Sequence, residues 1–221
     1  MFDSISTEYD LLNGIMTFNN HKRWKKNILN LAKKIQPKNA LDLATGTADI
    51  AINLGAIPNC KVIGVDISEQ MLNVGRKKII KLGLATTVNL ETGDAEHLNY
   101  KDDFFDLITI GFGVRNFQNL KGGLKESLRV LKPKGTLIIL ETSVPKNIVV
   151  RFFYSLFTRT YIPLMARLFS KDISAYNYLL NSAEAFPCGS EFGNILKSVG
   201  FTKIQIKPKF FGSSTIYIAS K

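Results

Sequence analysis

The chain is poor in the residues that build covalent or metal-based frameworks. Its 221 residues include two cysteines, two histidines and one tryptophan. Cys60 and Cys188 lie far apart, so a disulfide framework or a cysteine-based zinc site has little material to work with. His21 and His97 are too few and too scattered for a metal centre, and we expect both to be structural residues that form hydrogen bonds. The sequence therefore predicts a protein without a metal, suited to a reducing compartment.

Long apolar runs and export signals are also scarce. The first ten residues carry acidic side chains where a signal peptide needs a basic region followed by an apolar stretch. Residues 148–169 are apolar and aromatic, but three arginines and a proline interrupt them: Arg151, Arg159, Arg167 and Pro163. An arginine at the centre of a membrane span costs about 2.5–3.5 kcal/mol on insertion scales. We therefore expect a cytoplasmic protein whose basic, amphipathic segment lies on a membrane surface or over an apolar ligand.

Acidic residues are outnumbered, with 18 Asp and Glu against 29 Lys and Arg, for a net charge of +11. Such an excess indicates an anionic partner, either nucleic acid or a phospholipid surface, and charge alone does not choose between them. Much of the excess lies in residues 21–38, where Trp24, Ile28, Leu31 and Ile35 follow helical spacing. This segment is predicted to be an amphipathic helix whose basic side is either simply solvated or an anionic docking surface.

Short β-rich runs alternate with helical patterns from residue 39 onward, which is typical of a parallel sheet with crossover helices. The predicted strands are residues 40–44, 61–66, 87–91, 105–111 and 136–141, and a helix at 191–197 precedes an antiparallel pair at 203–207 and 215–219. Ser68 is a predicted N-cap, and a helix at 120–131 is expected to stop at Lys132-Pro133, before a turn at Lys134-Gly135. We expect one domain over 1–221, with an N-terminal helical cap (1–38) and a helical insertion or lid (145–182).

Polar and small residues follow successive predicted strands. Gly46 comes after the first strand and opens a helix, where a glycine lets the backbone approach a ligand and leaves N–H groups free to donate. Asp66 ends the second strand, where its carboxylate can accept hydrogen bonds from ribose hydroxyls, and Asp94 follows the third. A dinucleotide site would need two further glycines after Gly46, whereas the chain has Ala48 and Ala51. A nucleoside ligand is favoured over a pyrophosphate.

These motifs carry a family resemblance. The order Asp42-Leu-Ala-Thr-Gly46-Thr, Val65-Asp66-Ile-Ser, Gly93-Asp94-Ala95 and Leu131-Lys-Pro-Lys-Gly135 resembles the class I S-adenosylmethionine-dependent methyltransferases. The segments MFDSI at 1–5, HKRW at 21–24, GFGVRN at 111–116, AYNYL at 175–179 and Phe186-Pro187 are similar to the menaquinone and ubiquinone C-methyltransferases. The resemblance covers nearly the whole chain and implies a seven-stranded, mostly parallel α/β sheet with helices on both faces.

The resemblance also implies roles for single residues. Asp42, Gly46 and Thr47 would line the methionine end of S-adenosylmethionine, and Asp66 would hold its ribose. Asp94 and Ala95 would contact the adenine, with Gly111 also in the cofactor site. Arg115 and Asn116 would lie beside the quinol, and Tyr9 would close over the site. Arg115 is a poor base, so we expect it to stabilise an oxyanion or orient a proton-accepting water, with Asn116 as hydrogen-bond donor.

The implied reaction is methylation of a ring carbon of demethylmenaquinol, with a polyprenyl quinol and an anionic membrane surface as partners, no nucleic acid, and a homodimer left open. The resemblance also implies that the protein is cytoplasmic and peripherally bound at the inner face of the membrane. Three alternatives remain: a ubiquinone-pathway quinol methyltransferase, an RNA methyltransferase, and a non-catalytic quinone-binding module. The RNA alternative is weakened because residues 111–116 lack the Asn/Asp-Pro-Pro-Tyr pattern of amino-nitrogen methylation.

Overall fold

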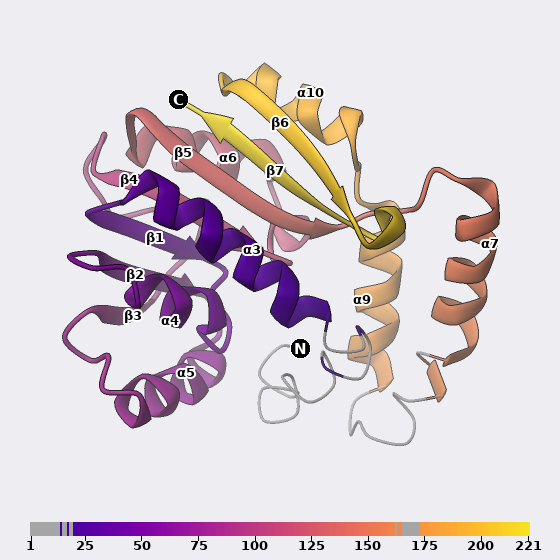
Figure 1. Ribbon diagram of the computed structural model, residues 1–221, viewed down its shortest axis with the longest axis horizontal. Coiled ribbons are helices and arrows are strands. Elements are labelled where there is room, and N and C mark those ends of the chain that lie inside the picture. Colours follow the sequence, from indigo (N-terminus) through magenta and orange to yellow (C-terminus); the bar gives the residue numbers. More distant parts are fainter. Residues whose placement is uncertain (1–13, 15–16, 18–19, 162, 165–172) are drawn as a thin grey trace.

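A seven-stranded sheet of strand order β3-β2-β1-β4-β5-β7-β6 organises the computed structural model (Figure 1). The structure describes residues 14, 17, 20–161, 163–164 and 173–221. The first five strands are parallel, and β7 inserts antiparallel between β5 and β6. The strands are β1 (Asn39–Leu43), β2 (Lys61–Asp66), β3 (Val88–Thr92), β4 (Phe105–Gly111), β5 (Leu131–Thr142), β6 (Thr202–Lys209) and β7 (Ser214–Ser220). The predicted α/β class and the seven strands are confirmed.

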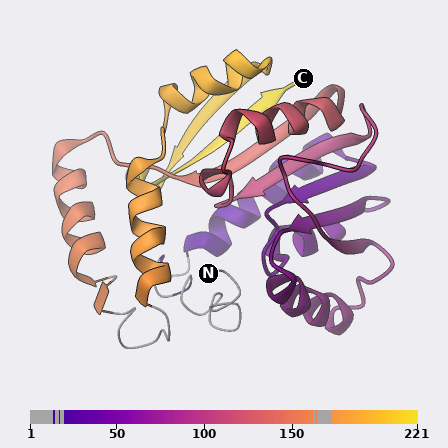
Figure 2. The same cartoon turned by 180° about the vertical axis from the view of Figure 1, so that it is seen from behind.

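Helices cover both faces of this sheet, as the two opposite views show (Figures 1 and 2). On one face α3 (Asn20–Ile35), α4 (Asp49–Gly55) and α5 (Glu69–Lys81) bury an apolar cluster that includes Ile28, Leu54 and Leu72. On the other face α6 (Leu120–Val130) and α10 (Ser190–Val199) bury Leu124 and Phe192. Both clusters contain fully buried strand residues, because a parallel sheet is covered on both sides and its strands are apolar on both faces.

Several predicted element ends shift by a few residues. The N-terminal helix ends at Ile35 rather than at 38, because Gln36 adopts a left-handed φ of 51° and Pro37 follows it. The strand predicted to start at 136 begins at Leu131, and the predicted turn at Lys134-Gly135 is an irregularity within β5, where Lys134 has a left-handed φ of 65°. Ser68 is confirmed as an N-cap, since its hydroxyl accepts a hydrogen bond from the N–H of Met71 at 3.2 Å.

The segment predicted as a helical insertion or lid (145–182) contains helices that extend beyond the carboxyl ends of the parallel strands (Figure 1). Its described elements are α7 (Ile148–Leu156), the π-helical turn η2 (Phe157–Tyr161) and α9 (Ile173–Ala185). The described residues also form two short 3-10 helices, η1 (Val114–Asn116) after β4 and η3 (Phe210–Gly212) between β6 and β7. Within the described residues, no helix is long and apolar enough to span a membrane.

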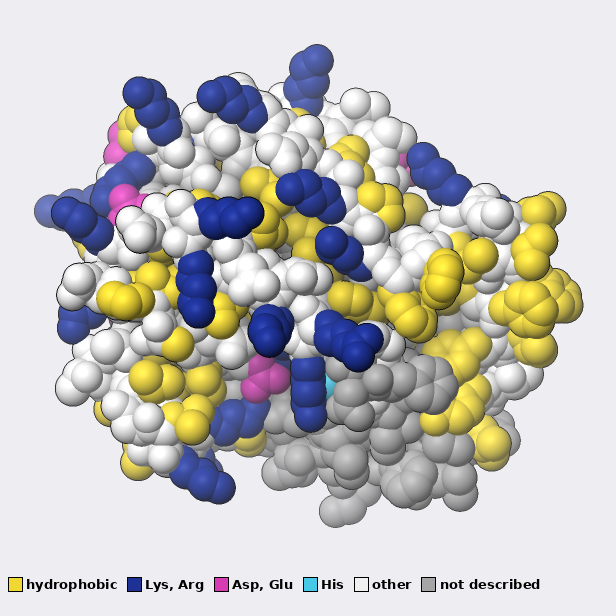
Figure 3. All heavy atoms as spheres, viewed as in Figure 1, with side chains coloured by type: hydrophobic (Ala, Val, Ile, Leu, Met, Phe, Trp, Pro, Cys, Tyr) yellow, Lys and Arg dark blue, Asp and Glu magenta, His cyan; other side chains and the backbone are white. Residues whose placement is uncertain are grey.

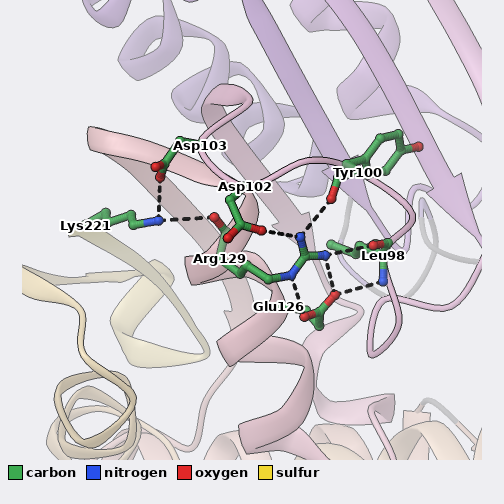
Figure 4. Close-up of polar contacts among 7 residues, drawn as sticks. All are labelled: Leu98, Tyr100, Asp102, Asp103, Glu126, Arg129 and Lys221. Atoms are coloured by element: carbon green, nitrogen blue, oxygen red, sulfur yellow. Dashed lines mark hydrogen bonds and ion pairs between the residues drawn. The ribbon is translucent and has the colours of Figure 1, made fainter.

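Arg129 at the end of α6 fixes the connection between β3 and β4 (Figure 4). Its guanidinium donates to the carbonyls of Leu98 and Tyr100 at 2.8 and 2.7 Å and to the Asp102 carboxylate at 2.7 Å. Glu126, one turn earlier on α6, accepts from Arg129 and from the N–H of Leu98. The same connection contains residues 93–95, which were predicted to bind a ligand. Contacts from α6 therefore help to hold these residues in position.

Candidate active site

Two adjoining cavities open at the carboxyl ends of β1 and β4. The larger has a volume of about 360 Å³ and the smaller about 190 Å³. Both are lined by Ala44, Gly46, Gly111 and Phe112, so the loop after β1 and the end of β4 form the boundary between them. Ligands of open parallel sheets bind at this edge. The cavities therefore lie where the sequence motifs predicted a ligand.

The loop after β1 is held in a tight turn against β2. Ala44, Gly46 and Ala48 all have left-handed backbone angles, with φ of 51°, 56° and 66°. The N–H of Gly46 donates to Asp66 Oδ2 at 2.7 Å, and the N–H of Ser68 donates to Asp66 Oδ1 at 2.9 Å. A Cβ added to Gly46 would meet no atom within 4 Å, so the space above this residue belongs to the cavities. These bonds orient the Asp66 carboxylate at the wall of the smaller cavity.

Asp42 is a buried carboxylate at the wall of the larger cavity, with a relative exposure of 1%. Its two oxygens accept hydrogen bonds from the hydroxyls of Thr45 and Thr109, each at 2.6 Å. Burial raises the pKa of Asp42 to about 6, although these hydroxyls and the charge of Lys25 oppose the shift. Because burial makes the negative charge of Asp42 unfavourable, a cationic group of a ligand placed beside this carboxylate would stabilise it.

Asp94, Ala95 and Asn116 line the smaller cavity together with Asp66. Asp94 Oδ1 accepts from the N–H of Glu96 at 2.8 Å, which shapes the turn after β3. The Oδ1 of Asn116 is buried and has no hydrogen-bond partner within the described part of the chain. An unsatisfied buried polar group costs about 1–3 kcal/mol, so a ligand that donates to this oxygen would recover that cost.

A search for similar proteins relates the whole chain to one family. Residues 1–221 match the model of the ubiE/COQ5 methyltransferase family. A demethylmenaquinone methyltransferase of Bacteroides fragilis is 39% identical over 222 residues, covering 100% of this chain and 91% of that protein. One from Bacillus cereus is 40% identical over 223 residues, covering 100% and 94%.

The chain belongs to the ubiE/COQ5 methyltransferase family. Solved structures agree on the fold. A SAM-dependent methyltransferase from Aquifex aeolicus superposes with a TM-score of 0.59 at 19% identity, covering 82% of this chain and 81% of that one. Phosphoethanolamine N-methyltransferase 2 of Haemonchus contortus gives a TM-score of 0.61 at 16% identity, covering 83% and 48%.

The residues for which the family resemblance implied roles divide between the two cavities. Asp42, Thr47 and Arg115 line the larger, while Asp66, Asp94, Ala95 and Asn116 line the smaller. Gly46 and Gly111 lie at the boundary. Arg115 and Asn116, although adjacent, therefore face different cavities. Tyr9 lies outside the described residues.

Arg115 is tied down by a buried ion pair that the sequence reasoning missed. Its Nη1 donates to Glu141 Oε1 at 2.5 Å and to the carbonyl of Phe112 at 2.9 Å, while its Nε donates to Ser182 Oγ at 3.3 Å. The side chains of Arg115 and Glu141 are only 6% and 0% exposed. Glu141 ends the apolar run of β5 at the same edge as Asp42 and Asp66, and that position was the available sequence signal.

A second ion-pair cluster joins α3 to the loop that contains Gly46. The Asp49 carboxylate accepts from Lys25 Nζ at 2.7 Å and Lys78 Nζ at 2.8 Å, and Lys78 also donates to Thr47 Oγ1 at 3.0 Å. Burial opposes ionisation of Asp49, but the two ammonium groups hold its pKa at about 2. Asp49 is therefore a permanent anion that attaches α3 and α5 to the start of α4.

The outer part of the larger cavity is aromatic. Side chains from α7, η2 and η3 line it: Phe153, Tyr154, Phe157, Phe210 and Phe211. The sequence reasoning noted the aromatic density of residues 148–169 but missed the contribution of η3, the turn between β6 and β7 that lies beside the end of β5. Among the described residues, no group of three or more His, Cys, Asp or Glu side chains is arranged to hold a metal ion.

Proposed function

We propose that this chain transfers a methyl group from S-adenosylmethionine to a ring carbon of demethylmenaquinol, giving menaquinol. The observation that carries the proposal is the pair of joined cavities: a polar one lined by Asp66 and Asp94, and a larger one whose wall is aromatic. A nucleoside fits the first and a fused aromatic ring with an apolar tail fits the second. The names of the relatives in Bacteroides fragilis and Bacillus cereus favour the same substrate.

The residues present fit the cofactor. Asp42 would face its ammonium group, since a buried carboxylate with a raised pKa gains most from a cationic partner. Asp66 would accept from the ribose hydroxyls, and the unpaired Oδ1 of Asn116 would accept from an N–H of the ligand. The open space above Gly46 would leave room where the two cavities meet. When bound, the cofactor supplies a methyl group on a positively charged sulfur.

The chain's own contribution is mainly positioning. Holding two reactants in line is worth about 7–11 kcal/mol of barrier when the geometry is good. The aromatic wall would hold the ring flat, and Glu141 would hold the Arg115 guanidinium in place so that its cationic N–H groups face the ring oxygen. A cation at that point favours the oxyanion that forms when the hydroxyl loses its proton. Arg115 would then act electrostatically rather than as a base.

The deciding experiment is methyl transfer to chemically reduced demethylmenaquinone in liposomes, read out as product mass. The expected product gains one methyl group on the ring. A demethylated ubiquinol precursor and total RNA serve as parallel substrates. Turnover on the ubiquinol ring alone, or on RNA with a steep salt dependence, would replace this function by one of those alternatives. Quinol binding without transfer to any substrate would indicate a quinone-binding module.

We further propose that the protein works at the anionic inner face of the cytoplasmic membrane. Exposed basic side chains of α3 support this location: Lys22, Arg23, Lys26, Lys33 and Lys34. The aromatic mouth of the larger cavity supports it as well, because a polyprenyl tail must remain in an apolar medium. Nucleic acid is not an expected partner. A homodimer remains a prediction that analytical ultracentrifugation tests.

A further inference from the structure

Lys25 differs from the other lysines and the arginine of α3 in where its side chain lies. The other basic residues of this helix, at positions 22, 23, 26, 33 and 34, are exposed. The Lys25 side chain is only 14% exposed and lines the larger cavity. Taking an ammonium group out of water is costly unless anions compensate its charge. The anions that face Lys25 therefore decide what this residue can do.

Asp49 fixes the position of the Lys25 ammonium group. Lys25 Nζ donates to Asp49 Oδ2 at 2.7 Å, and Lys78 Nζ donates to the other oxygen at 2.8 Å. An ammonium group carries three N–H donors, and within the described residues Asp49 is the one hydrogen-bond partner of Lys25. Lys25 therefore keeps donors for a second anion in the cavity that it lines.

The charged groups at this end of the larger cavity balance one another. Asp42 and Asp49 are the acidic residues among its described lining residues, and the ammonium groups of Lys25 and Lys78 lie beside them. Burial raises the pKa of Asp42 and the charge of Lys25 lowers it, so Lys25 is close enough to act on this carboxylate. A ligand end with one cationic and one anionic group matches Asp42 and Lys25 and preserves this balance.

Other donors near this end of the cavity are already engaged within the protein. The backbone N–H groups of Thr45, Gly46 and Ala48 all donate to protein oxygens at 2.7–3.0 Å. Arg115 also lines the larger cavity, but its guanidinium is held in a buried ion pair. Lys25 is thus the cation best placed to receive an anionic group beside Asp42.

We propose that Lys25 binds the carboxylate of the amino-acid end of S-adenosylmethionine, with Asp49 as its positioning residue; this rests on the proposed function. Asp42 would face the ammonium group of the same end, so two opposite charges of the ligand meet two opposite charges of the protein. Charge-assisted hydrogen bonds of this kind are about twice as strong as neutral ones. Lys25 then determines specificity, because a cofactor without the carboxylate loses this contact.

The first test compares S-adenosylmethionine with decarboxylated S-adenosylmethionine, which has the same nucleoside, sulfonium and amino groups but no carboxylate. Calorimetric titration measures both affinities without turnover. The wild-type chain should bind S-adenosylmethionine at least about tenfold more tightly, as expected for a hydrogen-bonded charge pair. In Lys25→Met this preference should fall below threefold, mainly through weaker binding of S-adenosylmethionine. Lys25→Arg keeps the positive charge and should restore most of the preference.

Lys78→Met is the matched control. It has the same net charge as Lys25→Met and likewise leaves Asp49 with one lysine partner, but Lys78 does not line the larger cavity. Its preference for S-adenosylmethionine should stay within threefold of that of the wild type. An equal fall in both lysine variants would show that Lys25 acts only through Asp49 or through overall charge, and would overturn the proposal.

A wild-type chain that binds the two cofactors equally well overturns the role of Lys25, even if neither variant folds. A Lys25→Met variant that retains the wild-type preference does the same. These outcomes leave the proposed function intact as long as methyl transfer to demethylmenaquinol is observed. A wild-type chain that does not bind S-adenosylmethionine, or transfers no methyl group to the quinol, instead overturns the proposed function itself.

Discussion

Three acidic side chains lie at the same sheet edge, Asp42 and Glu141 buried and Asp49 half-buried, each in a different electrostatic situation. Asp42 is compensated by two hydroxyls and by the charge of Lys25 without an ion pair, Asp49 by two ammonium groups, and Glu141 by one guanidinium. Their pKa directions follow from these partners: burial raises that of Asp42, while lysines hold that of Asp49 low. Asp42 is thus the carboxylate that a cationic ligand would stabilise most.

Replacing Asp42 by Asn should make the folded protein more stable at neutral pH but weaken its binding of S-adenosylmethionine. The folded-state pKa of about 6 lies above the ordinary value of 3.8, so the folded state binds more protons between these values and loses stability as pH rises through them. Asp42→Asn should therefore raise the free energy of unfolding at pH 7–8 by up to about 3 kcal/mol. As pH rises from 4 to 6, the free energy of unfolding should also decrease less in the variant than in the wild type. Urea unfolding measures both.

The same variant should bind S-adenosylmethionine at least tenfold more weakly, because the charge opposite the ammonium group is lost. Calorimetric titration measures the affinity. Thr109→Val removes one of the two hydroxyls and is the matched control: the charge remains with less stabilisation, so it should lower the stability at pH 7. A more stable Thr109→Val protein would contradict this account of Asp42.

Removing Glu141 should be costly because it leaves the Arg115 guanidinium buried and unpaired. Breaking a buried pair by deleting one partner typically costs about 3–5 kcal/mol, so we expect a loss of that order for Glu141→Ala. The double variant Arg115→Met/Glu141→Leu should recover much of that stability but not the turnover. Glu69→Ala, which breaks the exposed pair with Arg76, should change stability little. Equal losses for the buried and exposed pairs would refute this explanation.

At the scale of elements, α7 is unusual because none of its residues is buried. Val150, Phe153 and Tyr154 line the larger cavity, whereas Ile148, Val149, Phe152 and Leu156 point outward and are 52–80% exposed. Phe211 of η3 is 78% exposed at the same cavity. Figure 3 shows hydrophobic side chains gathered where α7 lies, with basic ones over α3 on the same face. This arrangement supports contact with an anionic bilayer.

Membrane binding should therefore depend on the apolar residues of α7 and η3. Burying one large side chain is worth about 1.5–3 kcal/mol, so Phe152→Ser/Phe211→Ser should weaken partitioning to phosphatidylglycerol vesicles at least tenfold. Cosedimentation measures the bound fraction. Ile80→Ser removes a similarly exposed residue from α5 (71%) and should leave binding unchanged. Equal binding to neutral phosphatidylcholine vesicles would argue against the role of the basic helix.

At the scale of the whole molecule, one sheet edge collects residues that are distant in the chain. The larger cavity is lined by residues from α3, the loops after β1 and β4, α7, α9 and η3. The smaller one depends on the connection between β3 and β4, which Arg129 anchors from α6. Contacts made by α6, which does not line either cavity, thereby influence the shape of the smaller cavity.

Arg129→Ala should loosen that connection without touching either cavity. We expect faster hydrogen exchange over residues 93–104 and weaker S-adenosylmethionine binding, with a loss of about 1–3 kcal/mol in stability because several hydrogen bonds to the guanidinium disappear. Lys132→Ala is the control, since its pair with Asp106 joins β5 to β4 and lies outside this connection. An unchanged exchange rate at 93–104 in Arg129→Ala would show that α6 does not support the site.

The local pattern of the sequence was sufficient for the elements and for one wall of the site. Alternating apolar runs predicted every strand of the sheet, and small or acidic residues at the strand ends marked Gly46, Asp66 and Asp94, because parallel strands bring their carboxyl ends to one edge. The exceptions were segment ends, such as the start of β5 at Leu131, where pairing with β4 keeps the turn signal of Lys134-Gly135 within the strand as an irregularity.

Only the tertiary structure decided which residues meet across long separations. The Arg115–Glu141 pair joins η1 to β5, Phe210 and Phe211 reach the cavity from the far end of the chain, and His21 faces the same space from α3. None of these contacts follows from local periodicity, because each depends on how helices and loops pack over the sheet edge. The sequence determines the spacing of apolar and polar residues in each helix and strand. Packing determines which polar groups are buried next to one another, and therefore which charges act in the site.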